Sequence, residues 1–512
     1  MKKFLWIACL FNLTVYGQQS NGSNLFNDEF VHELKITFAD SNFWELLTND
    51  YNEFLQTGSV TYRHASIEFD GDIVNNVGIK QRGQYSNFGF PGLKKPFKID
   101  LDRFVNNQSL DGIDKFNLAN FALDPSFIRD KVAYDFHHLI GNIAPRASYA
   151  QVYINEQYWG LYLLVEQIES SFLLRNFNSK EGSLFKAQND TDLDWRGFDP
   201  TLYPEIKLKS GEQTWSSLLE LMNTFNNQYS DFLFSEKLNN LIDLDNYFSV
   251  LTLDVFINNW DSYYDNGRNF YLYHDPTSGL FKWIPWDYNL SFSNNYASIL
   301  PQDGSNDNHK PLIKAIIKNE CLKTKYLETF CPLIQSTLTK ENTDQIINKN
   351  VDLIKDLISG DPNKFYSKSL FNTNITDAVF VEKIFNDDTS IVRIPGIKTL
   401  ITERINQISK ELWQQNIDCT SPYSCETCFS FRLFPNPARD VLHLEYTSQE
   451  ANEVLQLQII DEFGRIITQS HLTPTQSKIE IQLNDFPSGV YQIRITNSNG
   501  ISRRQKLVIT HG

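Results

Sequence analysis

Long apolar runs are missing from this sequence outside its first residues. No other stretch approaches the 18 uninterrupted apolar residues that indicate a membrane-spanning helix, so we predict no transmembrane segment. Positive charge is also scarce, because 46 Lys and Arg stand against 62 Asp and Glu, a net charge of −16. Nucleic-acid binding depends on cations that neutralise phosphates, so this balance argues against it. A phosphate-bearing ligand would need a local basic pocket or a metal ion.

The chain begins with a short apolar segment, MKKFLWIACLFNLTVYG. Lys2 and Lys3 form a positive n-region, residues 4–13 an apolar core and residues 15–17 a small-residue cleavage site. This order is typical of a secretory signal peptide, which we predict over residues 1–17. The segment is too short to span a bilayer. The alternative is a soluble amphipathic N-terminal helix.

Cysteine is sparse, and removal of the signal peptide would leave five. In an oxidising compartment, disulfides are the default expectation. Cys425 and Cys428 have the C-x-x-C spacing that also binds zinc or supports redox chemistry, but a second matching pair is absent. We therefore predict disulfides or free thiols rather than a metal site.

No internal repeat of 20–50 residues is present, and the chain divides by composition instead. Residues 31 to about 200 mix short strand-like runs with turns, such as Asn155–Glu156. Apolar residues at three-to-four spacing predict helices from about 215 to 260 and over most of 312–415. Residues 419–430, CTSPYSCETCFS, break this pattern and indicate a linker.

Residues 431–512 alternate apolar and polar positions between Pro, Gly and Asn turns, which predicts a small all-β sandwich. The tail resembles the type A C-terminal sorting domain of the type IX secretion system in four segments: PNP at 435–437, IIDEFGRII, FPSGVYQIRI and RRQKLVI. This resemblance implies type IX secretion machinery as a partner, a location outside the cell or on its outer surface, and removal of the tail. An ordinary carbohydrate-binding or adhesion sandwich is the alternative.

Three polar residues in the middle of the chain suggest chemistry. Asp261 follows a hydrophobic helix, Asn269 begins a strand, and Asp287 ends the next strand across the turn HDPTSG. Pairing of these strands would bring Asn269 and Asp287 together, and their oxygens suit Mg²⁺. Asp261 could then accept a proton from an attacking hydroxyl. A simple capping role for Asp261 or Asp265 is the alternative.

Residues 31 to about 410 resemble the CotH kinase family, the spore-coat-protein-H type of atypical secreted kinase. The resemblance rests on segments in family order: GIKQRGQYS, LKKPFKIDL, FIRDKVAYDF, VYINEQYWGLYLLVEQIESSFL, GSLFKA, NWD, NFYLY and IPWD. It implies that Asp261 is the catalytic aspartate and that Asn269 and Asp287 bind metal. Asn266, five residues after Asp261, is the substitute for Asn269.

A kinase of this family needs cations to stabilise the charge of the transferred phosphoryl group. Our candidates are Arg82, Lys95, Lys98 and Lys186. Glu166, at the end of an apolar strand, suits an ion-pair partner for a phosphate-binding lysine. The alternative for each is a solvated strand charge.

The implied fold is α+β, with an atypical protein-kinase-like, two-lobed domain over 31–415 and an all-β sandwich over 431–512. The implied function is transfer of phosphate from ATP, with Mg²⁺, to Ser or Thr of an extracellular or surface protein. The alternative is a catalytically inactive kinase-fold scaffold or adhesion protein of the cell surface.

Asn289 departs from the family pattern, in which P-W-D-x-D is common and a second acid stands at this position. Loss of that charge would weaken metal binding if the acid normally holds metal. Upstream, we predict that Arg129 and Asp130 form a structural ion pair.

Overall fold

The computed structural model describes most of the chain between residues 21 and 511. The described residues are 21–188, 190–211, 215–227, 231–294, 297–301, 310–385, 388–417, 419, 430–447, 454–461, 465–472, 478–496 and 502–511. The predicted signal peptide and the C-x-x-C pair at Cys425 and Cys428 lie outside them. No helix among these residues has the length and apolar character needed to cross a membrane.

The first part of the chain is a closed barrel of seven strands, in the order β1-β2-β3-β4-β5-β7-β6. β1 runs parallel to β6, and the other neighbouring pairs are antiparallel. Asp70–Gly71 and Asn155–Glu156 form two of its hairpin turns, and all four residues have the positive φ that two-residue hairpin loops favour. The turn predicted at Asn155–Glu156 is confirmed. The strands are β1 His32–Thr37, β2 Arg63–Phe69, β3 Asp72–Gln81, β4 Phe97–Asp100, β5 Lys115–Ala119, β6 Ala147–Ile154 and β7 Gln157–Glu166.

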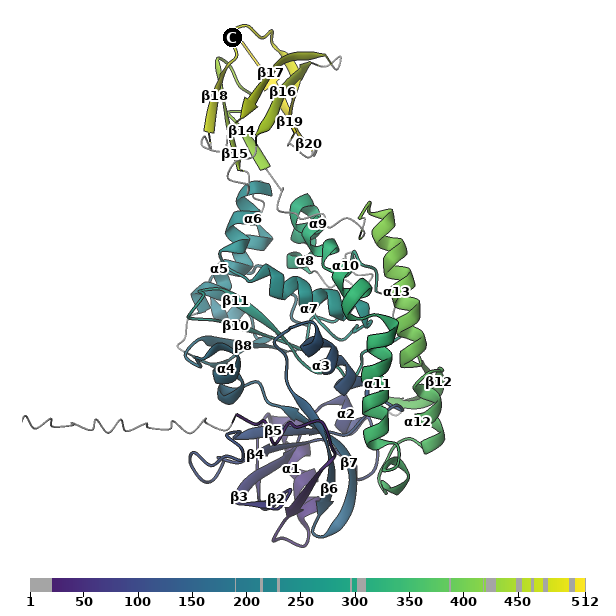
Figure 1. The fold of residues 1–512 in the computed structure, drawn as a ribbon. Coiled ribbons are helices and arrows are strands. Elements are labelled where there is room, and N and C mark those ends of the chain that lie inside the picture. The colour runs from purple at the N-terminus through teal and green to yellow at the C-terminus, as the bar shows by residue number, and fades with distance from the viewer. Residues whose placement is uncertain are drawn as a thin grey trace, which may run out of the picture.

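A second sheet, in the order β11-β10-β8-β9, lies among helices in the middle of the molecule (Figure 1). Its strands are β8 Ser183–Ala187, β9 Ile206–Ser210, β10 Phe270–His274 and β11 Phe281–Pro285. The helices that precede β10 are α1 Phe43–Thr57, α2 Tyr85–Phe88, α3 Arg129–Leu139, α4 Ser170–Phe177, η1 Pro200–Leu202, α5 Trp215–Asn226, α6 Asp231–Asn239 and α7 Leu244–Phe256. This sheet and α7 share one large apolar core.

Helices dominate residues 311–414, as predicted, and a two-stranded hairpin interrupts them. The helices are α8 Pro311–Lys318, α9 Glu320–Glu328, α10 Phe330–Pro332, η2 Leu333–Thr337, α11 Lys340–Ile354, η3 Ile358–Gly360, α12 Lys368–Asn374 and α13 Ile397–Gln414. The hairpin pairs β12 Val379–Phe385 with β13 Asp388–Ile394. The sequence VFVEKIF is rich in β-branched and aromatic residues, which favour a strand.

A buried ion pair connects the barrel to the helical part. Lys94, between α2 and β4, contacts Asp361, which directly follows η3, and both side chains are fully buried. Asp361 also accepts the backbone N–H of Leu161 at 3.0 Å and of Asn363 at 2.9 Å. Since a buried charge is costly unless it is paired, this contact ties the two parts to one relative position.

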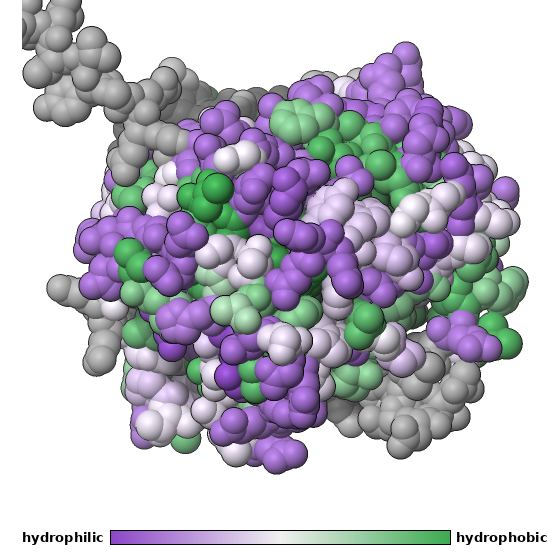
Figure 2. Space-filling model, turned by 90° about the horizontal axis from the view of Figure 1, so that it is seen from below, coloured by the Kyte–Doolittle hydropathy of each residue, from purple (hydrophilic) through white to green (hydrophobic). Residues whose placement is uncertain are grey.

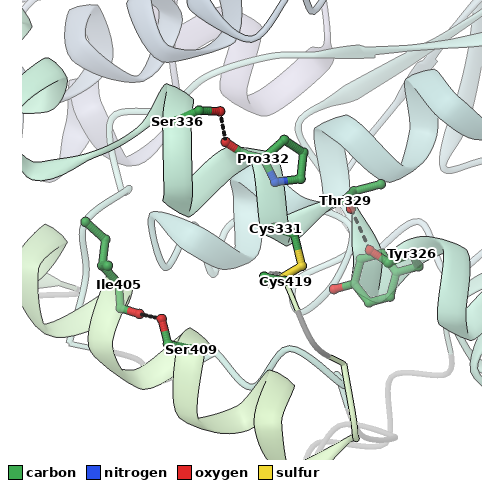
Figure 3. Close-up of a disulfide and its surroundings, with 8 residues drawn as sticks. All are labelled: Tyr326, Thr329, Cys331, Pro332, Ser336, Ile405, Ser409 and Cys419. Carbon is green, nitrogen blue, oxygen red and sulfur yellow. Dashed lines mark hydrogen bonds between the residues drawn. A yellow bond between two sulfur atoms is a disulfide. The ribbon is translucent and has the colours of Figure 1, made fainter. Parts of the chain in front are cut away.

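A disulfide joins Cys331 of α10 to Cys419, beyond the end of α13 (Figure 3). The bond closes a loop of 88 residues along the chain. The general expectation of disulfides is confirmed here, although the sequence did not predict which cysteines pair. The bond attaches the end of the helical part to α10.

The C-terminal part is all-β, as predicted, with its own apolar core. Two sheets form it, in the orders β14-β15-β18 and β17-β16-β19-β20. The strands are β14 Ser430–Phe434, β15 Val441–Thr447, β16 Leu455–Asp461, β17 Ile466–Leu472, β18 Lys478–Gln482, β19 Gly489–Thr496 and β20 Ser502–Ile509.

Seen from the opposite, barrel end, the surface mixes hydrophilic residues with smaller apolar areas (Figure 2). The α+β class predicted from the sequence is confirmed.

Candidate active site

Asp261 lies in the loop between helix α7 and strand β10. Asn258, with a φ of 52°, turns the chain out of the helix. The buried Arg404 of α13 donates to the carbonyl oxygens of Val255 and Phe256 in the last turn of α7. The carbonyl of Val255 also accepts the Asn258 N–H at 3.3 Å, so the arginine adds a donor there and supplies one to Phe256 in the last turn. The loop therefore leaves α7 from a fixed point.

Three side chains surround the Asp261 carboxyl group, and the residue is only 7% exposed. Asn266 Nδ2 donates to Oδ1 at 2.6 Å, and Asn269 Nδ2 donates to Oδ2 at 2.9 Å. Arg268 Nε lies 3.4 Å from Oδ1. Burial raises the pKa of Asp261 to about 6, and the Arg268 charge and the two amides oppose that rise. At neutral pH the carboxylate is therefore mostly ionised and able to accept a proton.

Asn269 and Asp287 stand at adjoining ends of β10 and β11. Phe270 is opposite Pro285, and Trp286 N–H donates to Asn269 O at 3.0 Å, so the strand pairing expected from the sequence is present. Both residues have left-handed φ values, 60° and 58°. These are conformations that Asn and Asp tolerate better than most residues. Asn269, just before β10, and Asp287, just after β11, therefore lie at the same edge of the sheet.

The oxygens at this edge fit a hard cation. The Asn269 amide turns its Nδ2 towards Asp261, which leaves Oδ1 pointing away from that carboxylate. Asp287 supplies a carboxylate beside it. Within the part of the chain that the structure describes, no group of three or more His, Cys, Asp or Glu forms a metal site. An amide, a carboxylate, water and phosphate oxygens are the set that Mg²⁺ takes in nucleotide sites.

Two of the predicted cations approach this edge. Lys186 of β8 is opposite Tyr271 in the sheet, with Nζ 5.5 Å from the ring centroid. Arg82 Cζ lies 5.6 Å from the centroid of Trp286, the residue before Asp287. Burial lowers the pKa of Lys186 to about 8, the Arg82 charge lowers it further, and Asp287 opposes both. These three charges therefore act on one another.

Lys98 is held by an acid beside the same cations. Its Nζ donates to Glu169 Oε1 at 3.0 Å, and in the barrel it is paired with Lys80 of the adjacent strand. Burial lowers the pKa of Lys80 to about 8, and the charges of Lys98, Arg82 and Lys186 lower it further. Lys95 does not join this group, because its Nζ donates to the carbonyls of Asn87 and Phe90.

Residues 79–407 match the family model described as CotH kinase protein, which is more than half of the chain. The chain belongs to the CotH kinase family. A second model, described as the secretion system C-terminal sorting domain, matches residues 432–510. The match covers the C-terminal sheets, and it implies export to the cell surface or beyond.

Three curated relatives match at low identity. The inner spore coat protein H of Bacillus subtilis is 25% identical over 284 residues, which cover 53% of this chain and 75% of that protein. The invasin CotH3 of Rhizopus delemar is 24% identical over 195 residues, 36% of this chain and 32% of the invasin. The invasin CotH2 of the same organism is 21% identical over 287 residues, 53% of this chain and 46% of the invasin. This chain thus spans under half of either invasin.

The Glu166 prediction needs correction in this CotH-family chain. Glu166 is fully buried, and its partners are arginines: Arg146 at 2.8 Å and Arg175 at 2.7 Å. The acid that holds a lysine is Glu169, three residues later, at the start of α4. The sequence segment VEQIES contains both, but β7 ends at Glu166 and turns that side chain away from Lys98.

Helix α3 supports the edge formed by Asn269 and Asp287, which the sequence analysis missed. Tyr134 Oη accepts the Asp287 N–H at 3.1 Å, and Asp130 Oδ1 accepts the Tyr288 N–H at 2.7 Å. Asp130 is 8% exposed, and burial together with the Asp287 charge raises its pKa well above the usual range. The predicted Arg129–Asp130 pair is wrong, because Arg129 pairs with Asp124 instead (Nε to Oδ1, 3.5 Å).

Asp254, in α7, is a second support that the sequence analysis missed. Its Oδ1 accepts the Asn259 Nδ2 at 3.0 Å, and its backbone carbonyl accepts the Asn259 N–H at 2.9 Å. Burial raises the pKa of Asp254 to about 7, and the hydrogen bond from Asn259 opposes that rise. Asp254 therefore fixes the first residue of the N-W-D segment that carries Asp261.

Proposed function

We propose that this protein is a secreted kinase that transfers the γ-phosphoryl group of ATP to a Ser or Thr hydroxyl of an extracellular or surface protein. The observation that carries the proposal is the approach of three elements: the ionised Asp261, the Asn269–Asp287 edge, and the cations Arg82 and Lys186. Phosphoryl transfer needs these three parts, a proton acceptor, a metal edge and positive charge. Membership of the CotH kinase family supports the same reaction.

In the proposed reaction the acceptor hydroxyl lies against Asp261. The carboxylate takes the hydroxyl proton as the oxygen bonds to the γ-phosphorus, the bond to the β-phosphate oxygen breaks, and ADP leaves. Arg268 and Asn266 hold Asp261 in one orientation. Arg82 and Lys186 counter the negative charge that gathers on the phosphates. A Mg²⁺ ion held by Asn269 and Asp287 would supply further positive charge there.

Radiolabelling of the mature chain, residues 18–512, tests the proposal. With [γ-³²P]ATP, Mg²⁺ and casein as a generic acceptor, wild-type protein should label itself or the casein. Asp261→Asn should lower the rate about 100-fold or more, the usual size of a general-base contribution. Asp287→Asn should do the same through loss of metal.

Asp265→Asn is the matched control, because Asp265 lies in the same loop, whereas the groups that hold the Asp261 carboxyl are Asn266, Asn269 and Arg268. It should label at close to the wild-type rate. Equal labelling by wild type, Asp261→Asn and Asp287→Asn would refute the assignment of the site.

A non-enzymatic surface protein is the second candidate. Asn289 favours it, because this chain carries an amide where the family commonly has a second acid. The names of two relatives, invasin CotH2 and invasin CotH3, suggest a role at a cell surface. Calorimetric titration with ATP and Mg²⁺ separates the candidates: a kinase binds the nucleotide, and complete absence of binding would leave the scaffold.

A further inference from the structure

We propose that Asp130 of helix α3 supplies the second carboxylate of the metal site, in place of the acid that is missing at Asn289. This inference rests on the proposed metal-dependent function and names a further ligand for it. Asp130 lies 157 residues before Asp287 along the chain, so neither sequence spacing nor the IPWD segment points to it.

The position of Asp130 is fixed from two directions. Its Oδ1 accepts the N–H of Tyr288, the residue after Asp287, at 2.7 Å. Arg129, next to it in α3, donates to the carbonyl of Phe292 at 3.0 Å and to Asn374 Oδ1 at 2.9 Å. The start of α3 is thereby attached to the segment that follows the metal edge. One carboxyl oxygen of Asp130 is used by this support, and the other is available to a ligand.

The charge of Asp130 lacks a partner of its own. Among the described residues, no Lys, Arg or His nitrogen lies within 4.0 Å of the carboxylate of Asp130 or of Asp287. Asp130 is nevertheless buried, with only 8% of its surface exposed. A buried carboxylate without a cation is costly, and the like charge of the half-buried Asp287 adds a further cost to that of Asp130. A divalent cation between Asp130 and Asp287 removes both costs.

The cations near the site contact other residues and do not neutralise Asp130. Arg82 acts on Asp130 electrostatically, but it lies over the Trp286 ring and forms no ion pair with the acid among the described residues. Lys186 is placed across the sheet, against Tyr271. Asn289 is half-buried and brings no charge. Asp130 is therefore the acid that the fold offers to Asp287.

The test is Mn²⁺ binding to the mature chain without nucleotide, measured by calorimetry and by electron paramagnetic resonance. Asp287→Asn should abolish binding, and Asp130→Asn should weaken it about tenfold or more, because ligand charge sets the affinity of hard cations. Asp135→Asn is the matched control. It removes a carboxylate of the same helix whose partners are Lys131 and Asn350 rather than the metal edge, so it should change the affinity less than about threefold.

Asn289→Asp provides a second, independent readout. In the wild-type background it should change Mn²⁺ affinity little, because Asp130 already fills the role. In the Asp130→Asn background it should restore most of the lost affinity. Wild-type affinity in Asp130→Asn, equal losses in Asp130→Asn and Asp135→Asn, or a large gain from Asn289→Asp alone would each overturn the inference. Binding that survives Asp287→Asn would instead refute the metal edge, and with it the proposed function.

Discussion

The buried ion pair between Lys94 and Asp361 makes a prediction about stability whose size follows from its surroundings. Both side chains are fully buried, and they lie 267 residues apart along the chain. The two partners differ in what else they contact. Asp361 keeps two backbone N–H donors, whereas the ammonium of Lys94 faces the rings of Phe121 and Tyr162, each centroid 5.5 Å away.

This difference predicts unequal costs for the two single substitutions. Lys94→Met leaves an anion that two N–H groups still stabilise, so we expect a loss of about 3 kcal/mol, the low end for a broken buried pair. Asp361→Asn leaves an ammonium among apolar groups, which must then lose its proton. Neutralising a lysine with an ordinary pKa near 10.5 at pH 7 costs about 5 kcal/mol, so this variant should be the less stable one.

The pH dependence distinguishes this account from simple loss of packing. Burial already lowers the pKa of Lys94 to about 8, although the Asp361 charge opposes that shift. Without Asp361 the pKa should fall below 7, so the folded variant binds fewer protons than the unfolded chain. Its stability should then rise with pH relative to wild type, by about 1 kcal/mol between pH 7 and pH 8. Between pH 8 and pH 9 the difference should change by only about 0.4 kcal/mol more, and above pH 9, where both folded proteins have lost the proton, it should stay constant.

Urea unfolding of the mature chain, followed by tryptophan fluorescence, measures these values. The double variant Lys94→Met/Asp361→Asn completes the cycle and should be more stable than Asp361→Asn alone, because no charge remains buried. If Lys94→Met were the costlier single change, or if the deficit of Asp361→Asn did not depend on pH, the reasoning would fail.

Two further predictions concern single groups. Burial raises the pKa of Asp254 to about 7, so the folded chain keeps this proton while the unfolded chain, with a pKa near 3.8, has lost it. The stability of the wild type should therefore fall as pH rises. In thermal unfolding, the stability of Asp254→Asn relative to wild type should increase by about 2 kcal/mol from pH 5 to pH 7. A difference that does not depend on pH would contradict this. Replacing both Cys331 and Cys419 by Ser should lower stability by about 4 kcal/mol, since the disulfide closes a loop of 88 residues. An unchanged urea midpoint would show that the disulfide does not stabilise the folded protein.

The sequence predicted those parts of the site that depend on neighbours along the chain. Asp275, in the turn HDPTSG, accepts the N–H groups of Thr277 and Ser278, and this local geometry sets the pairing of β10 with β11. Because that pairing is local, the approach of Asn269 and Asp287 could be expected from the sequence alone. The turn at Asn155–Glu156 was predictable for the same reason.

Contacts between distant segments could not be predicted in this way. The segment LKKPFK contains three lysines, and we selected Lys95 and Lys98 while Lys94 is the one in a buried pair. Which neighbour faces inwards depends on Asp361, far along the chain. The choice of Glu166 over Glu169 failed for the same reason, because it depends on where Lys98 lies, on β4, which β5 separates from β7 in the barrel. The roles assigned to the site residues stay predictions until the labelling experiment is done.

The disulfide also determines which residues would carry a mechanical force applied to the C-terminal tail. The match to the sorting domain begins at residue 432, 13 residues beyond Cys419, so a force applied to this domain reaches the covalent bond first. The load then passes into α10 through Cys331 and bypasses α13, whose Arg404 fixes the end of α7. A force on the tail should therefore leave α7 and the loop that carries Asp261 in place.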